Sequence, residues 1–138
     1  MILVDSNVLI DILDDDVRWF DWSMKQLETA SNSGRVFINH VILAEVAPHQ
    51  GDLALFLEKL DTMLIEIEPL SDKGAFIAGN AFLEYRRRRE GRHIVLPDFL
   101  IGGHAHALGA SILTRDPRVY KAYFPTVPLI TPQKDAND

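Results

Sequence analysis

The segment MILVDSNVLIDIL, residues 1–13, is the part of the sequence from which the fold is most readily predicted. Its apolar residues 2–4 are followed at once by a carboxylate, Asp5. A short continuous apolar run with a polar boundary is typical of a strand that is buried on both faces. Residues 8–13 are also apolar, apart from Asp11, and fit a short helix. The segment therefore predicts a buried strand that delivers Asp5 at its C-terminal end.

The same succession of short apolar runs and helical patterns continues along the chain. Further strands are expected at residues 36–38, 63–67, 111–114 and 127–130, and helices at residues 17–31, 40–47, 53–60, 71–89 and 98–108. Ser71 is a suitable N-cap, and Gly109 is a suitable residue to end the last helix. Prolines on both sides of the last strand favour an edge position for it. Apolar strands that alternate with helices indicate an α/β fold with a central, mostly parallel sheet of about five strands.

Length and composition limit the class of protein. The 138 residues fit one domain, assigned to residues 1–132, with residues 133–138 as a flexible tail. The absence of cysteine excludes a disulfide scaffold and a thiolate metal site. No apolar run approaches the roughly 20 residues that span a bilayer. The apolar N-terminus is interrupted by Asp5 and Asp11 and lacks a basic leader, so we expect no secretory signal and a cytoplasmic protein.

Four carboxylates are expected to meet at one edge of this sheet. Asp5 and Asp116 follow predicted strands, Glu45 lies in the helix after the second strand, and Asp98 starts a helix after Pro97. Ligands of open α/β sheets bind at the carboxyl ends of the strands. Converging carboxylates repel one another unless a cation joins them, and an all-oxygen site suits Mg²⁺ or Mn²⁺. Each acid taken alone is more often a plain turn, cap or solvated residue, so the prediction rests on all four falling at one edge of the same sheet.

Four segments that contain these acids resemble the motifs of PIN-domain ribonucleases, especially the VapC-like toxins of toxin–antitoxin modules. They are MILVDSNVLID (residues 1–11), ILAEV (residues 42–46), LPDFLIGGHA (residues 96–105) and ILTRD (residues 112–116). The resemblance implies a three-layer α/β sandwich. It also implies a Mg²⁺- or Mn²⁺-dependent endoribonuclease that hydrolyses RNA phosphodiesters with a cation-activated water. A homodimer and a small antitoxin protein that blocks the site are the implied partners.

The resemblance also implies roles for single residues. Asp5 and Asp98 would ligate the main metal, Asp116 would complete its shell, and Glu45 would hold a second metal or orient the attacking water. Ser6, Asn7 and Thr114 resemble supporting polar residues. Two departures stand out. Gly102 and Gly103 replace small Ala pairs, and Pro117 and Arg118 stand where many members have a further acid, which leaves a second metal open.

The basic residues are unevenly distributed, which weakens any conclusion from the net charge of −6. Of the 14 Lys and Arg residues, seven lie between residues 86 and 118, namely Arg86, Arg87, Arg88, Arg89, Arg92, Arg115 and Arg118. Arg86, Arg89 and Arg115 are the candidates for contact with RNA phosphates, because guanidinium groups suit bidentate phosphate binding. The alternative is a solvated helix end that interacts with the helix dipole.

Other interpretations stay open. His104 and His106 are two residues apart, which does not suit a helical metal pair, and we expect structural or surface roles for them. A PIN-domain nuclease of RNA processing without an antitoxin and a non-catalytic PIN-fold binding module are the alternatives to a toxin. A phosphoacceptor domain of the response-regulator kind would require a lysine after a late strand, where this chain has Thr114-Arg115-Asp116.

Overall fold

The computed structural model describes residues 1–88 and 96–133, which contain a sheet of five parallel strands. The strands follow the order β3-β2-β1-β4-β5. Their bounds are β1 (Ile2–Val4), β2 (Val36–Ile38), β3 (Ile65–Ile67), β4 (Ser111–Leu113) and β5 (Leu129–Ile130). The predicted α/β class and parallel sheet are confirmed, and β5 lies at an edge as its flanking prolines indicate.

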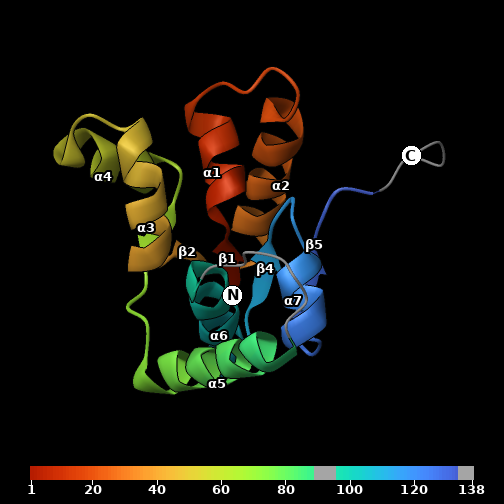
Figure 1. Cartoon of the computed structure of the whole chain (residues 1–138). Helices are drawn as coiled ribbons and strands as arrows, with labels where there is room; N and C mark the ends of the chain where they lie inside the picture. The colour runs from red at the N-terminus through yellow and green to blue at the C-terminus, as the bar shows by residue number, and fades with distance from the viewer. Residues whose placement is uncertain (89–95, 134–138) are drawn as a thin grey trace.

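Helices surround this sheet (Figure 1). The described residues form α1 (Ser6–Leu13), α2 (Phe20–Ser33), α3 (His40–Val46), α4 (Leu53–Thr62), α5 (Asp72–Arg88), α6 (Leu96–Leu108), α7 (Arg118–Tyr123) and a 3₁₀ turn at Ala47–His49. In the view of Figure 1, α1 and α2 lie side by side at the top and α5 lies across the bottom beneath α6. None of the described helices is long and apolar enough to cross a membrane.

Some predicted boundaries were wrong by a few residues for local reasons. The helix expected from residue 17 begins at Phe20, because Asp16 Oδ1 accepts the backbone N–H groups of Arg18 and Trp19 and forms a turn first. The helix expected from residue 98 already begins at Leu96 and includes Pro97 in its first turn, where its missing N–H costs nothing. The short helix α7 follows Asp116 and Pro117, a common helix start in sequences, but its extent was not predicted.

The central strands are buried on both faces. No surface is exposed by the register partners Leu3, Phe37 and Ile112 on one face, or by the residues that follow them on the other face, Val4, Ile38 and Leu113. Burying such a side chain is worth roughly 1.5–3 kcal/mol. In parallel pairing, Val4 lies opposite Leu113, so the residues that follow, Asp5 and Thr114, come out at the same edge of the sheet.

The glycine pair of α6 allows two close contacts. A Cβ on Gly103 would lie 2.5 Å from the carbonyl oxygen of Gly74 in α5, and one on Gly102 would lie 2.4 Å from the ring of Phe124. Both distances are shorter than real Cβ contacts, so alanine at either position would push an element away. The close approach at Gly103 fixes α6, with Asp98 in its first turn, against α5.

Candidate active site

Asp5 is the most deeply placed of the four acids, with 5% of its surface exposed. It follows β1, caps the N-terminus of α1, and its backbone N–H donates to Leu113 O of β4 at 2.9 Å. Its carboxylate accepts from Ser6 N (2.8 Å), Thr114 Oγ1 (2.9 Å) and Tyr120 Oη (2.8 Å), and more weakly from Ser6 Oγ (3.4 Å). Burial raises the pKa of Asp5, and these hydrogen bonds oppose the rise.

Glu45 approaches from α3, whose N-terminus is capped by the side chain of Asn39. Its Oε1 is buried and has no hydrogen-bond partner among the described residues. Burial raises the pKa of Glu45, the negative charges of Asp5 and Asp98 raise it further, and the Ser6 hydroxyl lowers it. A buried carboxylate oxygen without a partner is costly, so this atom is a candidate ligand for a cation.

Asp98 lies in the first turn of α6, where it is half-buried. Burial is the main reason that the pKa of Asp98 is raised to about 6, and the charges of Asp5 and Asp116 add to the effect. The positive charge of Arg118 partly opposes it. The charges of Asp5 and Asp98 thus act on Glu45, and those of Asp5 and Asp116 act on Asp98, so the acids from β1, α3, α6 and the end of β4 interact electrostatically.

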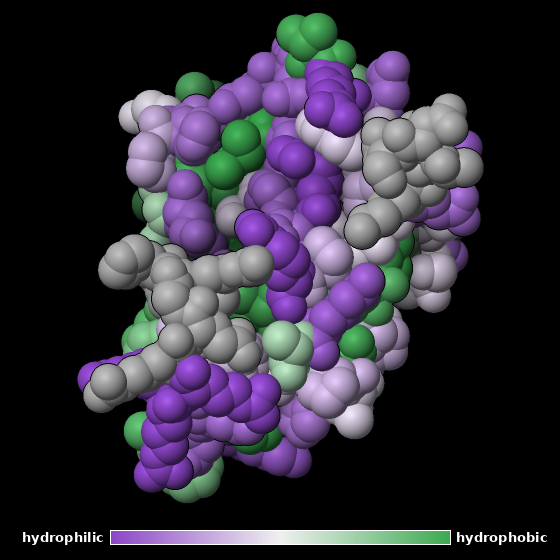
Figure 2. Space-filling model, turned by 45° about the vertical axis from the view of Figure 1, so that its right-hand side comes forward, coloured by the Kyte–Doolittle hydropathy of each residue, from purple (hydrophilic) through white to green (hydrophobic). Residues whose placement is uncertain are grey.

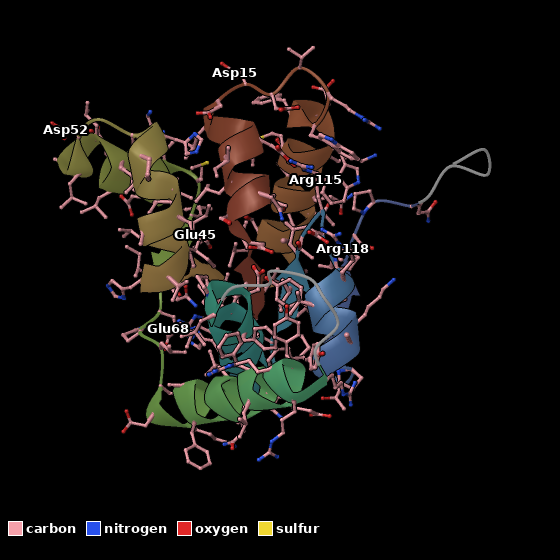
Figure 3. The ribbon with its side chains drawn as sticks, in the orientation of Figure 1. Asp15, Glu45, Asp52, Glu68, Arg115 and Arg118 are labelled. Atoms are coloured by element: carbon pink, nitrogen blue, oxygen red, sulfur yellow. The ribbon has the colours of Figure 1, made fainter. Side chains whose placement is uncertain are left out.

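Asp116 is the exposed member of the group. Arg118 binds it through two parallel hydrogen bonds, Nε to Oδ1 and Nη2 to Oδ2, both of 2.8 Å. This pairing is the largest reason that the pKa of Asp116 is lowered. Figure 3 shows Glu45 on α3 and Arg118 at the start of α7 on opposite sides of this central region, whereas Asp15 and Asp52 lie far from it.

The donor set suits a hard divalent cation, and the residues meet the chemical requirement for one. Four carboxylates are present, Asp5, Glu45 and Asp98 have raised pKa values, and Glu45 Oε1 lacks a partner. A bound cation would offset the repulsion between the carboxylates. Within residues 1–88 and 96–133, no three His, Asp or Glu side chains are already gathered closely enough to hold a metal together. A cation would therefore have to draw the carboxylates inward.

Thr114 and Asn7 connect the acids at the ends of β1 and β4. Thr114 Oγ1 donates to Asp5 Oδ2 and accepts from Asp116 N (3.0 Å) and Asn7 Nδ2 (3.2 Å). Asn7 Oδ1 in turn accepts from Arg115 N (3.0 Å). These residues and Ser6 contact Asp5 or the backbone at Asp116, and their supporting role in a site stays a prediction.

Arg115, a candidate for phosphate contact, faces away from the acids. Its guanidinium forms two bonds to the buried Asp11, Nε to Oδ2 at 2.6 Å and Nη2 to Oδ1 at 2.8 Å. Ser23 Oγ donates to the same carboxylate at 2.7 Å, and the Arg115 guanidinium lies over the ring of Trp19. Arg115, Asp11 and Ser23 therefore link the end of β4 to α1 and α2. The guanidinium of Arg115 is used in this link and is not free to contact a phosphate.

The arginine run is only partly covered by the structure. Arg86 is exposed in the last turn of α5. Arg88 forms an ion pair with Glu84 and lies over the ring of Tyr123. Arg89 and Arg92 lie outside the described residues. The proposed contact of Arg86 and Arg89 with RNA stays a prediction.

The histidines have the structural and surface positions expected for them. His104 is fully buried, its Nδ1 lies 3.0 Å from Asn39 Nδ2, and its ring packs edge-on against Phe37. Burial lowers the pKa of His104, which favours the neutral imidazole. His106 is exposed, with Nδ1 3.3 Å from Thr126 Oγ1.

Two site-related residues were missed in the sequence. Tyr120 donates to Asp5, and its pKa is raised well above its usual value by burial and by the neighbouring carboxylates. Asp11 anchors Arg115. The spacing of Tyr120 four residues after Asp116 is a signal that becomes readable once a helix is assigned after Pro117.

Figure 2 shows hydrophilic surface running through the middle of the face in view, with hydrophobic patches beside it.

Comparison with known proteins gives one sequence family and a set of similar structures. Residues 2–125 match the PIN domain family. Among curated proteins no sequence match was found. VapBC2 from Rickettsia felis, solved with a DNA fragment from its promoter, aligns with a TM-score of 0.73 and 24% identity over 95% of this chain and 98% of that chain. VapBC from Salmonella typhimurium, also solved with DNA, aligns with a TM-score of 0.69 and 19% identity over 94% of this chain and 96% of that chain.

A third similar structure is VapC20 from Mycobacterium tuberculosis, described as a Sarcin-Ricin loop cleaving toxin. It aligns with a TM-score of 0.62 and 16% identity over 88% of this chain and 95% of that chain. At such identities these likenesses establish a shared fold, and the match to the sequence family agrees with it.

Proposed function

The chain belongs to the PIN-domain family, and on that premise we propose that it is a Mg²⁺- or Mn²⁺-dependent endoribonuclease, the toxin of a toxin–antitoxin pair. The observation that carries the proposal is the group of carboxylates at the end of the sheet. Burial raises the pKa of Glu45 and of Asp98, the negative charge of Asp5 raises both further, and Glu45 Oε1 is buried without a partner among the described residues. Such a group is costly unless it holds a cation.

We assign the cation to Asp5 and Asp98, with Asp116 completing its shell and Glu45 as a further ligand or as the group that orients water. When bound, a divalent cation supplies charge stabilisation for a phosphoryl group and activates water. Ser6, Thr114 and Asn7 hold the Asp5 carboxylate and the backbone at Asp116 in place. Arg118 lies beside Asp116 with 71% of its side chain exposed, so it can reach an RNA phosphate near the cluster.

The proposal includes a small antitoxin protein as partner. It is supported by the similar structures, which were solved as VapBC complexes. It is also supported by a hollow of about 380 Å³ between α1 and α4, lined by Leu13, Leu55 and Met63 together with charged residues. Leu55 is 58% exposed. Such an apolar surface suits the apolar face of a partner helix. A homodimer is proposed on the family resemblance alone.

RNA cleavage by the purified chain tests the proposed reaction. We expect cleavage with Mg²⁺ or Mn²⁺, none with EDTA, and recovery when the cation is restored. Asp5→Asn should reduce the rate at least a hundredfold. Asp15→Asn is the matched control, because Asp15 is exposed, lies far from the cluster and has a φ of 49°, which asparagine accepts. Cleavage that continues in EDTA, or an active Asp5→Asn variant, would refute the proposed chemistry.

Purification of a tagged chain expressed from its own operon tests the partner. Recovery of a small protein that inhibits cleavage would support the toxin assignment. An active nuclease that is purified alone would favour the alternative, a PIN-domain nuclease of RNA processing. A chain that binds RNA without cutting it would favour a non-catalytic module.

A further inference from the structure

Tyr120 lies in α7 with 1% of its surface exposed, and its hydroxyl donates to Asp5 Oδ2 at 2.8 Å. The bond joins residues 115 positions apart, so it depends on how α7 packs against the end of β1. The same helix begins with Arg118, which binds Asp116. One short helix therefore contacts two of the four acids.

The two oxygens of the Asp5 carboxylate differ in how fully they are used. Oδ2 accepts two hydroxyl donors, Thr114 Oγ1 at 2.9 Å and Tyr120 Oη at 2.8 Å. Oδ1 accepts one short bond, from Ser6 N at 2.8 Å, and one long one, from Ser6 Oγ at 3.4 Å. Each carboxylate oxygen has about two lone-pair positions, so both positions of Oδ2 hold short bonds, whereas one position of Oδ1 holds only the long contact from Ser6 Oγ and can accept a ligand instead.

Ser6 contacts a different oxygen of Asp5 from the one that Thr114 and Tyr120 contact. Ser6 binds Oδ1 through its backbone N–H and its hydroxyl, whereas Thr114 and Tyr120 bind Oδ2. Thr114 and Tyr120 thus fix Oδ2, and Oδ1 is the oxygen on which a ligand can replace a weak contact.

We propose that Tyr120 is a positioning residue, whose hydroxyl holds Oδ2 of Asp5 so that Oδ1 is presented to a divalent cation. This inference rests on the proposed function, because it concerns the same cation site. Residues that orient metal ligands by hydrogen bonding typically change metal affinity about 10–100-fold when they are removed. A tyrosine that only fills the core would leave metal affinity unchanged when its hydroxyl is removed.

The test is the affinity of the full chain for Mn²⁺, measured as free Mn²⁺ by electron paramagnetic resonance. We expect Tyr120→Phe to weaken binding about tenfold or more. Tyr123→Phe is the matched control, since it removes the same group from the same helix, where the ring packs on Phe99 (5.3 Å) and Tyr85 (5.9 Å). Equal affinity of the wild type and Tyr120→Phe would overturn the inference. A wild type that binds no Mn²⁺ would instead overturn the proposed function, and this inference with it.

A second measurement on the wild-type chain covers the case in which Tyr120→Phe does not fold. The chain has three tyrosines, so ¹³C labelling at Cζ gives three signals, which Tyr85→Phe and Tyr123→Phe assign by elimination. Mg²⁺ at Asp5 should shift the Tyr120 signal more than the other two. A Tyr120 signal that stays in place while Mg²⁺ binds would overturn the inference.

Discussion

Arg115 and Asp116 are neighbours at the end of β4, and each forms a two-bonded acid–arginine pair, but the two pairs differ in burial. In the Asp11–Arg115 pair, the side chains are 2% and 27% exposed. In the Asp116–Arg118 pair, they are 51% and 71% exposed. The backbone turn at residues 115 and 116 thus sends one side chain into the interface with α1 and α2 and the other to the edge where the acids converge.

The difference in burial separates a structural role from an adjustable one. A buried pair cannot lose one partner without leaving an uncompensated charge, so it fixes the geometry around it. An exposed pair is screened by solvent and worth about 0–1 kcal/mol, so its partners can separate when a cation or a phosphate offers better contacts. We therefore regard the Asp11–Arg115 pair as part of the framework and Arg118 as a movable neighbour of the site.

The largest expected effect comes from breaking the buried pair. Arg115→Met should lower the free energy of unfolding by about 3–5 kcal/mol, because Asp11 would stay buried with only Ser23 as a side-chain donor. Urea denaturation measures it, with Arg118→Met as the matched control, for which we expect a loss below about 1 kcal/mol. Equal losses in the two variants would remove the distinction between the pairs.

A second prediction concerns the acids beside the exposed pair and depends on pH. The pKa of Asp98 is about 6 in the folded chain against 3.8 for an ordinary aspartate, so the folded state holds the proton more tightly. Without metal, stability should therefore fall as the pH rises from about 4 to 6. Asp98→Asn should remove this part of the slope and stabilise the metal-free chain at pH 7 by roughly 1–3 kcal/mol. A flatter slope in the wild type than in Asp98→Asn would contradict the direction of the shift.

A third prediction tests whether Arg118 is adjustable. Its positive charge lies beside Asp116 and lowers the pKa of Asp98, so it also opposes cation binding. Arg118→Gln should tighten Mn²⁺ binding roughly two- to tenfold and raise the pKa of Asp116 toward its ordinary value. Mn²⁺ titration and carboxyl-carbon NMR measure the two effects. Weaker Mn²⁺ binding would show that Arg118 supports the site instead.

The smallest expected effect concerns the arginines of α5. Arg86→Gln should weaken RNA binding a few-fold and reduce the slope of log affinity against log salt by about 0.7, the value for one lost phosphate contact on a single strand. Arg35→Gln, exposed next to the start of β2, is a control with the same change of charge. An identical salt slope for the wild type and Arg86→Gln would indicate a solvated helix end.

The parallel sheet could be predicted from the sequence, because short continuous apolar runs such as residues 2–4 are typical of strands that are buried on both faces. The glycine at residue 109 was predicted to end a helix, and it does so with a φ of 64°. The positions of Asp5 and Asp116 at one edge followed from parallel pairing. All of these features depend on local pattern or on strand register.

Long-range side-chain choices could not be predicted in the same way. The spacing of Tyr120 after Asp116 can indicate that it lies near the acids, but it does not show that its hydroxyl donates to Asp5, which precedes it by 115 positions. The guanidinium of Arg115 is a group that suits phosphate binding. Only the structure shows that it is already bound to the buried carboxylate of Asp11, 104 positions away. Such pairings are decided by how α1 and α7 pack on the sheet, which local periodicity does not determine.

The most direct test of the central claim is anomalous diffraction from a crystal soaked in Mn²⁺. We predict an anomalous peak within coordination distance of Asp5 Oδ1 and of the Asp98 carboxylate, bounded by Glu45, with the Asp5–Tyr120 hydrogen bond retained. A Mn²⁺ peak elsewhere on the chain, with none among these carboxylates, would contradict the assignment of this acidic cluster as a metal-dependent active site.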